Sequence, residues 1–116
     1  MFQVNFSNRA ITELNKLGKM EQMEVMEALG SVTPKRLVED TAEIGRFERD
    51  GVTLYRLRVD EWRVYFKTDA DRIVVQFLLH KRSIGDFVVR FKLPVSDEAE
   101  IEKHKSFRDY LDSLMK

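Results

Sequence analysis

A chain of 116 residues has the length of one domain, and 43% hydrophobic with 34% charged residues is the composition of a globular protein. Cysteine is absent, which excludes disulfides and thiolate metal sites, and with only two histidines we expect no metal or other cofactor. The N-terminal residues lack the basic and apolar regions of a signal peptide, and no stretch reaches the ~20 apolar residues of a membrane span. We therefore expect a cytoplasmic protein that does not bind a membrane.

The formal net charge is zero, with 20 basic and 20 acidic side chains, but the charges are unevenly distributed. Residues 54–92 carry nine basic and five acidic side chains, whereas the segments before and after them are acidic. A local surplus of this kind could attract an anion to one face, although an imbalance of this size also arises by chance.

The N-terminal residues predict a short strand followed by a helix. Apolar and polar side chains alternate from position 2 to position 6, which is the period of a strand with one buried face. Ser7 is a suitable N-cap for the helix. Its apolar stripe consists of Ala10, Leu14 and Leu17. Gly18 is expected to end this helix.

A second helix is predicted between Gly18 and Gly30, so that the two helices form a helical hairpin. Three methionines, Met20, Met23 and Met26, belong to its apolar set. Because methionine adapts to irregular gaps, we interpret them as core-filling residues rather than as a functional surface.

The middle of the chain predicts a connection followed by strands. Residues 33–45 are interpreted as a connection with one helical turn, and Asp50-Gly51 is a strong hairpin signal. Residues 52–59 and 62–67 alternate as strands around a tight turn. Residues 73–79 are almost continuously apolar, which predicts the central strand, covered on both faces.

The C-terminal third predicts helices. Apolar residues between positions 84 and 91 have helical spacing, although three of them would equally suit a strand; we predict a short helix. Pro94 breaks the chain, and Ser96 or Asp97 can cap a last helix over residues 96–116 with an acidic first turn. The element order predicts an α+β fold in which helices pack on one side of an antiparallel sheet.

Alternating arginines are the most distinctive feature. On a strand, Arg56 and Arg58 project from the same face about 7 Å apart, and Arg63 follows across the turn. Planar guanidinium groups at that spacing can bind two phosphate oxygens or two neighbouring phosphates. Trp62 and Tyr65 lie in the same hairpin and could stack on bases.

A structural interpretation of the same residues stays open. Arg56 and Arg58 could pair with carboxylates on a neighbouring strand, such as Glu48, and each aromatic residue could belong to the core. Lys81 and Arg82 add two cations beyond the last strand. No phosphate-loop, dinucleotide-binding, zincin or serine-hydrolase motif occurs in the sequence.

The run from Leu54 to Phe66 resembles the basic hairpin of the RelE/ParE superfamily of toxin–antitoxin toxins. The apolar strand ending in His80-Lys81-Arg82 resembles the last core strand of those toxins and the basic segment after it. The resemblance covers residues 2–90 of a single domain spanning 1–116, and the last helix, 96–116, extends beyond it. It implies a four-stranded antiparallel sheet with the N-terminal strand and helical hairpin packed against it.

The resemblance implies one of two activities. The RelE/HigB-like branch, which we favour, consists of endoribonucleases that cleave mRNA on the ribosome. The ParE branch inhibits DNA gyrase and is the alternative, together with a RelE-fold binding protein that has lost catalysis. In both branches a cognate antitoxin is the protein partner, and we expect this chain to form oligomers only through it.

On the favoured branch the reaction is metal-independent: a 2′-hydroxyl attacks the adjacent phosphate, and cations stabilise the charge that develops. The resemblance assigns Arg63 and Arg82 to the scissile phosphate, and Arg56 and Arg58 to the transition state and neighbouring phosphates. It leaves Lys81 as a further RNA-binding cation.

The sequence differs from the family pattern at the position of the proton-transfer group. Phe87 stands where many RelE-type nucleases carry a tyrosine or histidine, and it has no group that transfers a proton. His80 is the nearest candidate, since histidine titrates near neutrality, and Asp86 is the second.

Overall fold

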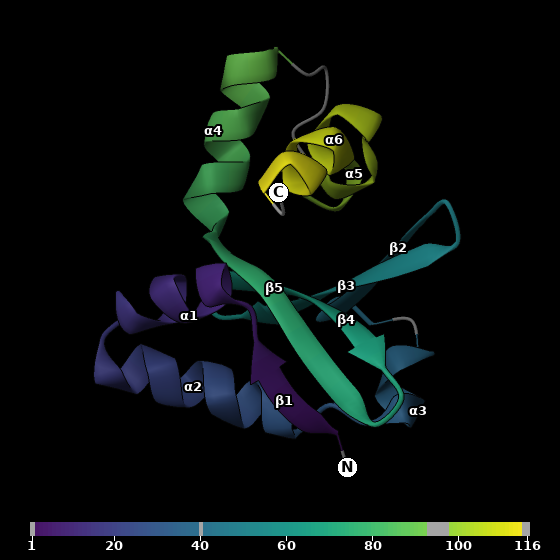
Figure 1. Cartoon of the computed structure of the whole chain (residues 1–116). Coiled ribbons are helices and arrows are strands. Elements are labelled where there is room, and N and C mark those ends of the chain that lie inside the picture. Colours follow the sequence, from purple (N-terminus) through teal and green to yellow (C-terminus); the bar gives the residue numbers. More distant parts are fainter. Residues whose placement is uncertain (1, 40, 93–97, 115–116) are drawn as a thin grey trace. The chain divides into compact units, whose positions relative to one another are not determined.

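The computed structural model describes residues 2–39, 41–92 and 98–114. These residues form two units, Met1–Leu78 and Leu79–Lys116. The first unit contains a sheet and three helices, and the second contains three further helices (Figure 1).

Five strands form one sheet in the order β1-β5-β4-β3-β2. They are β1 (Gln3–Phe6), β2 (Ile44–Arg49), β3 (Val52–Val59), β4 (Trp62–Asp69) and β5 (Arg72–His80). The pairs β2–β3 and β3–β4 are antiparallel, whereas β1 pairs with β5 in parallel. The predicted α+β fold is confirmed, and β1 enlarges the expected four-stranded sheet to five. The apolar strand β5 lies inside the sheet, but the prediction that it is the central strand was wrong, because β1 alone lies beyond it and β4 takes the middle position.

Short turns connect the successive strands β2 to β5. Asp50 and Gly51 both have positive φ, 54° and 77°, as a two-residue hairpin with a right-handed strand twist requires, so the predicted hairpin is confirmed. Asp60 and Ala70 also have positive φ, at 55° and 54°, in the next two turns. These turns fix the register of the sheet because each contains few residues.

The first unit contains the helices α1 (Asn8–Asn15), α2 (Lys19–Gly30) and the single turn α3 (Pro34–Leu37). Figure 1 shows α1 and α2 as a hairpin on one face of the sheet. Side chains of both helices pack with that face in one core: Ala10, Leu14, Leu17, Val25, Leu29, Val32, Leu37, Ile44, Leu57, Val59, Val64, Phe66, Ile73, Val75 and Leu78. The predicted apolar stripe of the first helix therefore belongs to the core.

Ser7 and Gly18 begin the two helices. The Ser7 hydroxyl accepts the Ala10 N–H at 3.1 Å, as predicted for the cap, and it also donates to the Gln76 carbonyl at 2.6 Å. Gly18 does not end α1, which stops at Asn15; it is the N-cap of α2, with extended backbone angles of φ −64° and ψ 160°. The prediction for Gly18 was wrong because the helix ended before the glycine was reached.

The interpretation of the three methionines as core-filling residues was also wrong. Met20, Met23 and Met26 are 71%, 58% and 45% exposed. The side of α2 that faces the core instead carries Val25 and Leu29, which are almost completely buried. We refer to the three exposed side chains as the methionine stripe.

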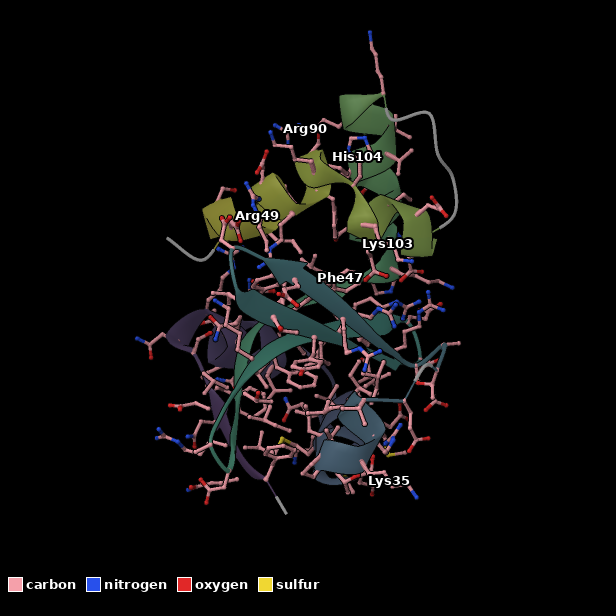
Figure 2. All side chains as sticks on the ribbon, turned by 90° about the vertical axis from the view of Figure 1, so that its right-hand side faces the viewer. Lys35, Phe47, Arg49, Arg90, Lys103 and His104 are labelled. Carbon is pink, nitrogen blue, oxygen red and sulfur yellow. The ribbon has the colours of Figure 1, made fainter. Side chains whose placement is uncertain are left out.

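The second unit contains α4 (Lys81–Phe91), α5 (Glu98–Lys103) and α6 (Lys105–Leu114). The predicted short helix after the last strand is therefore confirmed. The single helix predicted over 96–116 is instead two helices, interrupted at His104, which Figure 2 labels. Pro94, Ser96 and Asp97, predicted as breaker and caps, lie outside the described residues.

Three aromatic rings form the centre of this unit. Phe87 of α4 lies 5.1 Å from Phe107 and 5.2 Å from Tyr110, both of α6, measured between ring centroids. The Phe87–Phe107 pair is edge-to-face, an arrangement that stabilises the packing beyond what the buried area of the rings contributes. Within the described ranges no helix is long and apolar enough to cross a membrane.

Replacing Ser7 by alanine removes a helix cap and a link to β5 at once. We expect Ser7→Ala to lower the free energy of unfolding by about 1–3 kcal/mol, measured by urea denaturation. Thr12→Ala is the matched control, because that hydroxyl bonds only to the Asn8 carbonyl on the exposed side of the same helix. Equal effects of the two substitutions would show that neither the cap nor the link to β5 contributes.

Candidate functional site

The β3–β4 hairpin places the predicted arginines on one face of the sheet. Arg58 stands directly opposite Arg63, and Arg56 directly opposite Tyr65. Directly opposed residues of an antiparallel pair share a face, so the prediction that Arg56 and Arg58 project together is confirmed and Arg63 joins them. We call this surface, made by Arg56, Arg58, Arg63 and Tyr65, the arginine face. It is the opposite side of the sheet from the face that carries α1 and α2.

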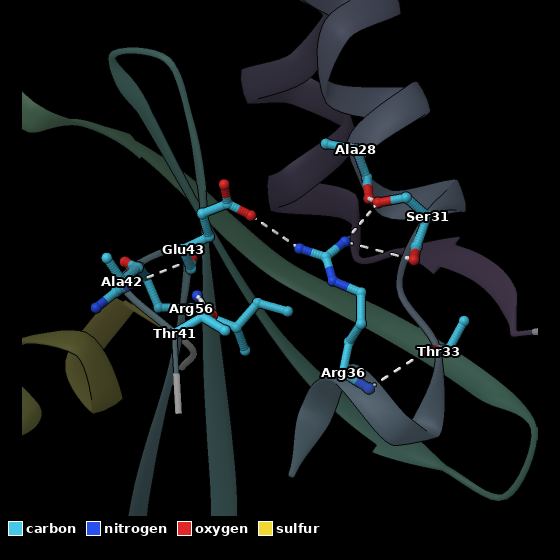
Figure 3. A network of polar contacts seen from close by, with 9 residues as sticks. Ala28, Ser31, Thr33, Arg36, Thr41, Ala42, Glu43 and Arg56 are labelled. Atoms are coloured by element: carbon cyan, nitrogen blue, oxygen red, sulfur yellow. Dashed lines mark hydrogen bonds and ion pairs between the residues drawn. The ribbon is translucent and has the colours of Figure 1, made fainter. Parts of the chain in front are cut away.

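Arg56 is 4% exposed and is held by backbone carbonyls. Its Nη1 donates to the carbonyl oxygens of Ala42 and Glu43, both at 3.1 Å (Figure 3). The Glu48 carboxylate that could have paired with it stands opposite Thr53 instead. Because arginine stays protonated, its burial requires such acceptors, and the bonds attach the loop before β2 to β3.

Gly45 makes room for the Arg56 side chain. It stands directly opposite Arg56 in the β2–β3 register, and a Cβ atom there would lie 2.8 Å from Arg56 Nη2 and 3.0 Å from the Phe47 ring. Real Cβ atoms do not approach other atoms so closely. A side chain at position 45 would therefore displace the buried guanidinium from its carbonyl partners.

Arg63 is 6% exposed and closes the turn between β3 and β4. Its Nη1 donates to the carbonyls of Asp60 at 2.8 Å and Trp62 at 3.0 Å. Arg58, directly across from it, is half-buried. The register therefore brings two guanidinium-bearing side chains together on one face of the strand pair.

The two aromatic residues of the hairpin lie on opposite faces. Tyr65 has no exposed surface, and its ring lies 5.0 Å from that of Phe77. Trp62 is half-buried on the helical side, where its Nε1 donates to Glu21 of α2 at 2.7 Å. In this arrangement Tyr65 is a core residue, and it could stack on a base only after a rearrangement.

The second unit holds the other predicted residues at the start of α4. Lys81, Arg82 and Asp86 are exposed, and His80 is the N-cap. The His80 Nδ1 accepts the Arg82 backbone N–H at 3.0 Å. A ring that accepts at Nδ1 carries its proton on Nε2, so His80 can donate a hydrogen bond from Nε2 while it caps the helix.

His104 performs the same structural task at the start of α6. Its Nδ1 accepts the Ser106 N–H at 3.2 Å. Both histidines of the chain are therefore helix caps, a role that the sequence analysis missed. The signal that could have indicated it is the position of each histidine just before an amphipathic segment.

A small cavity between α4 and α6 adds a residue that the sequence analysis did not consider. It measures about 180 Å³ and is lined by Ser83, Asp86, Phe87, Arg90 and Tyr110. The carboxylate-bearing Asp86 and the phenolic Tyr110 therefore line the same cavity. Within residues 2–39, 41–92 and 98–114, no group of three or more His, Asp or Glu side chains could hold a metal ion.

Gly45→Ala tests whether the room at position 45 matters. We expect it to lower the free energy of unfolding by about 1–2 kcal/mol, because the Cβ atom displaces the buried Arg56 guanidinium. Gly30→Ala is the matched control: nothing lies within 4 Å of its Cβ position, and alanine favours the helix by about 0.5–1 kcal/mol. If Gly45→Ala also stabilises the protein, the side chain of Arg56 is not held as described.

Two substitutions of His80 test its role as a helix cap. His80→Ala should accelerate hydrogen exchange of the Arg82 amide, whereas His80→Asn should preserve its protection, because asparagine is a good N-cap. Nuclear magnetic resonance of the intact chain reports both rates. Equal protection in the wild type and in His80→Ala would refute the cap.

Two solved structures share this fold. A chain of the archaeal RelE–RelB complex from Pyrococcus horikoshii OT3 matches with a TM-score of 0.57 and 18% identity, over 69% of this chain and 94% of that one. A chain of the toxin–antitoxin complex RelBE2 from Mycobacterium tuberculosis matches with a TM-score of 0.54 and 21% identity, over 68% and 96%. No protein-family model and no curated protein sequence matches this chain. The chain therefore has a RelE-like fold.

Proposed function

We propose that this chain is the toxin of a toxin–antitoxin system and cleaves mRNA on the ribosome as a metal-independent endoribonuclease. The observation that carries the proposal is the fold: the match includes 94% and 96% of two chains from toxin–antitoxin complexes. The retained arginines of the hairpin and the basic start of α4 agree with an RNA substrate. A cognate antitoxin is the partner that this proposal requires.

Lys81 and Arg82 are assigned to the RNA phosphates at the cut. Both side chains are exposed in the first turn of α4, where the helix dipole favours an anion. A guanidinium offers two parallel N–H donors to phosphate oxygens, and its charge stabilises the dianionic phosphorane as it forms. Arg82 is therefore the residue whose loss should affect the reaction most.

The arginine face is assigned to phosphates elsewhere along the RNA. Arg58, which is half-buried, is the arginine of this face assigned to contact a phosphate, and Arg63, 6% exposed, stands directly opposite it. Arg56 is assigned a positioning role in the sheet rather than a contact with RNA, because its guanidinium is bonded to the Ala42 and Glu43 carbonyls.

The reaction needs one group to take a proton and one to give a proton. Asp86 is the assigned base, because its exposed carboxylate can accept the proton of the attacking 2′-hydroxyl. The 2′-oxygen then bonds to phosphorus, and the bond to the 5′-oxygen breaks. The Tyr110 hydroxyl gives the leaving 5′-oxygen its proton, and His80 Nε2 can donate a hydrogen bond to that oxygen. The products are a 2′,3′-cyclic phosphate and a 5′-hydroxyl.

Induced expression in a bacterial host tests this proposal. The wild type should arrest growth and leave cuts inside translated messages, mapped by primer extension. Arg82→Ala should reduce cleavage by about 10²-fold, because one charge-stabilising donor is lost. The matched control is Lys35→Ala, an exposed cation on α3, labelled in Figure 2, which should behave as the wild type.

Three outcomes would contradict the proposal in different ways. Undiminished cleavage by a folded Arg82→Ala variant would show that the assigned site is wrong. A DNA-damage response without mRNA cleavage would favour gyrase inhibition. Absence of any toxicity would favour a binding protein with the same fold.

A further inference from the structure

The methionine stripe is an apolar surface that the core does not use. Met20, Met23 and Met26 recur every third residue along α2, on the side away from the buried Val25 and Leu29. A shallow groove beside them is lined by Lys19, Gln22, Met23, Met26 and Glu27. Exposed apolar side chains that gather on one element mark interaction sites, whereas scattered ones do not.

Methionine suits a surface that receives another chain. Its side chain is unbranched and polarisable, so it adapts to the shape of a partner. The stripe from Met20 to Met26 spans about 9 Å, or less than two helical turns. An amphipathic helix with apolar side chains every three or four residues matches that length.

The charges around the stripe determine what kind of partner fits. Glu24 and Glu27 are exposed on the same side of α2, and Lys19 is the only basic residue of the helix. The surface is therefore apolar with an acidic border. A partner that buries the methionines and complements this border carries lysine or arginine beside its apolar side chains.

A second copy of the chain fits this surface poorly. A symmetric dimer would bring Glu24 and Glu27 of one copy against the same residues of the other. Three methionines also provide much less than the roughly 800 Å² that each partner of a stable pair buries. The stripe is better suited to be one anchor of an extended partner that contacts the chain at several places.

We propose that the methionine stripe docks an amphipathic segment with apolar and basic side chains, and that this segment belongs to the antitoxin. The identity of the carrier rests on the proposed function, whereas the chemistry of the segment rests on the stripe and its acidic border. The stripe lies on the helical side of the first unit, opposite to the arginine face. None of the residues assigned to RNA binding or cleavage lies in the stripe, so substitutions in it should leave RNA cleavage unchanged.

Designed peptides test the surface directly on the full chain. One peptide of about 16 residues carries leucine and lysine in an amphipathic helical pattern, and its counterpart replaces lysine by glutamate. The methionine methyl resonances report binding. The basic peptide should shift those of Met20, Met23 and Met26, and the acidic peptide should not. Met23→Glu should weaken binding by about tenfold, while the control Val38→Glu, at a residue 71% exposed outside α2, should not change it.

Charge reversal gives a second, independent readout. The double substitution of Glu24 and Glu27 by lysine should reduce binding of the basic peptide and create binding of the acidic one. Equal binding of both peptides, no binding, or undiminished binding by Met23→Glu would overturn the proposal. Self-association of the wild type that Met23→Glu abolishes would overturn it in favour of a second copy.

The antitoxin that the proposed function requires provides the final comparison. Met23→Glu should cleave mRNA like the wild type and resist inhibition when the antitoxin is co-expressed, whereas Val38→Glu should remain inhibited. A wild-type chain that binds the basic peptide but cleaves no mRNA would refute the proposed function and leave the docking surface intact. An active toxin whose methionine stripe binds neither peptide nor antitoxin would refute the docking surface alone.

Discussion

Burial of the Arg56 guanidinium is the constraint on which the arrangement of the outer strands depends. A permanent positive charge can be buried only where acceptors surround it, and the carbonyls of Ala42 and Glu43 supply them. The buried guanidinium leaves no room for a side chain at the position opposite Arg56. That position is Gly45, and this requirement sets the register of β2 against β3. The same strand then presents Arg58 directly across from Arg63. A residue expected to bind phosphate thus positions its neighbours on the arginine face.

Local signals in the sequence predicted much of this fold. The Ser7 cap, the Asp50-Gly51 turn and the alternation of the hairpin depend on residues within a few positions of one another, and each was confirmed. The parallel pairing of β1 with β5 could not be predicted, because it joins segments about 70 residues apart. Alternation likewise identified the arginine face but not its burial, since a two-residue period assigns a side chain to a face and not to solvent or core.

The exposure of the methionines and the capping role of the histidines were not predicted, and each has its own physical reason. Helix α2 has more apolar residues than one face can bury, and Val25 and Leu29 occupy the core side, so the methionines are left outside. The histidines were considered only as titrating groups, yet an imidazole nitrogen is also a good acceptor for a helix amide. The sheet of the first unit therefore carries largely buried arginines on one side, and the helices on its other side carry an exposed methionine stripe with an acidic border.

The central proposal is that cations and a 2′-hydroxyl cleave the RNA, and the chemical ends of the cut strands test it most directly. Purified chain should be incubated with ribosomes programmed with a short message, and the ends of the fragments analysed chemically. The mechanism predicts a 2′,3′-cyclic phosphate, or the phosphate formed by its hydrolysis, upstream of the cut, with a 5′-hydroxyl downstream. A 3′-hydroxyl with a 5′-phosphate, or no ribosome-dependent cleavage at all, would contradict it.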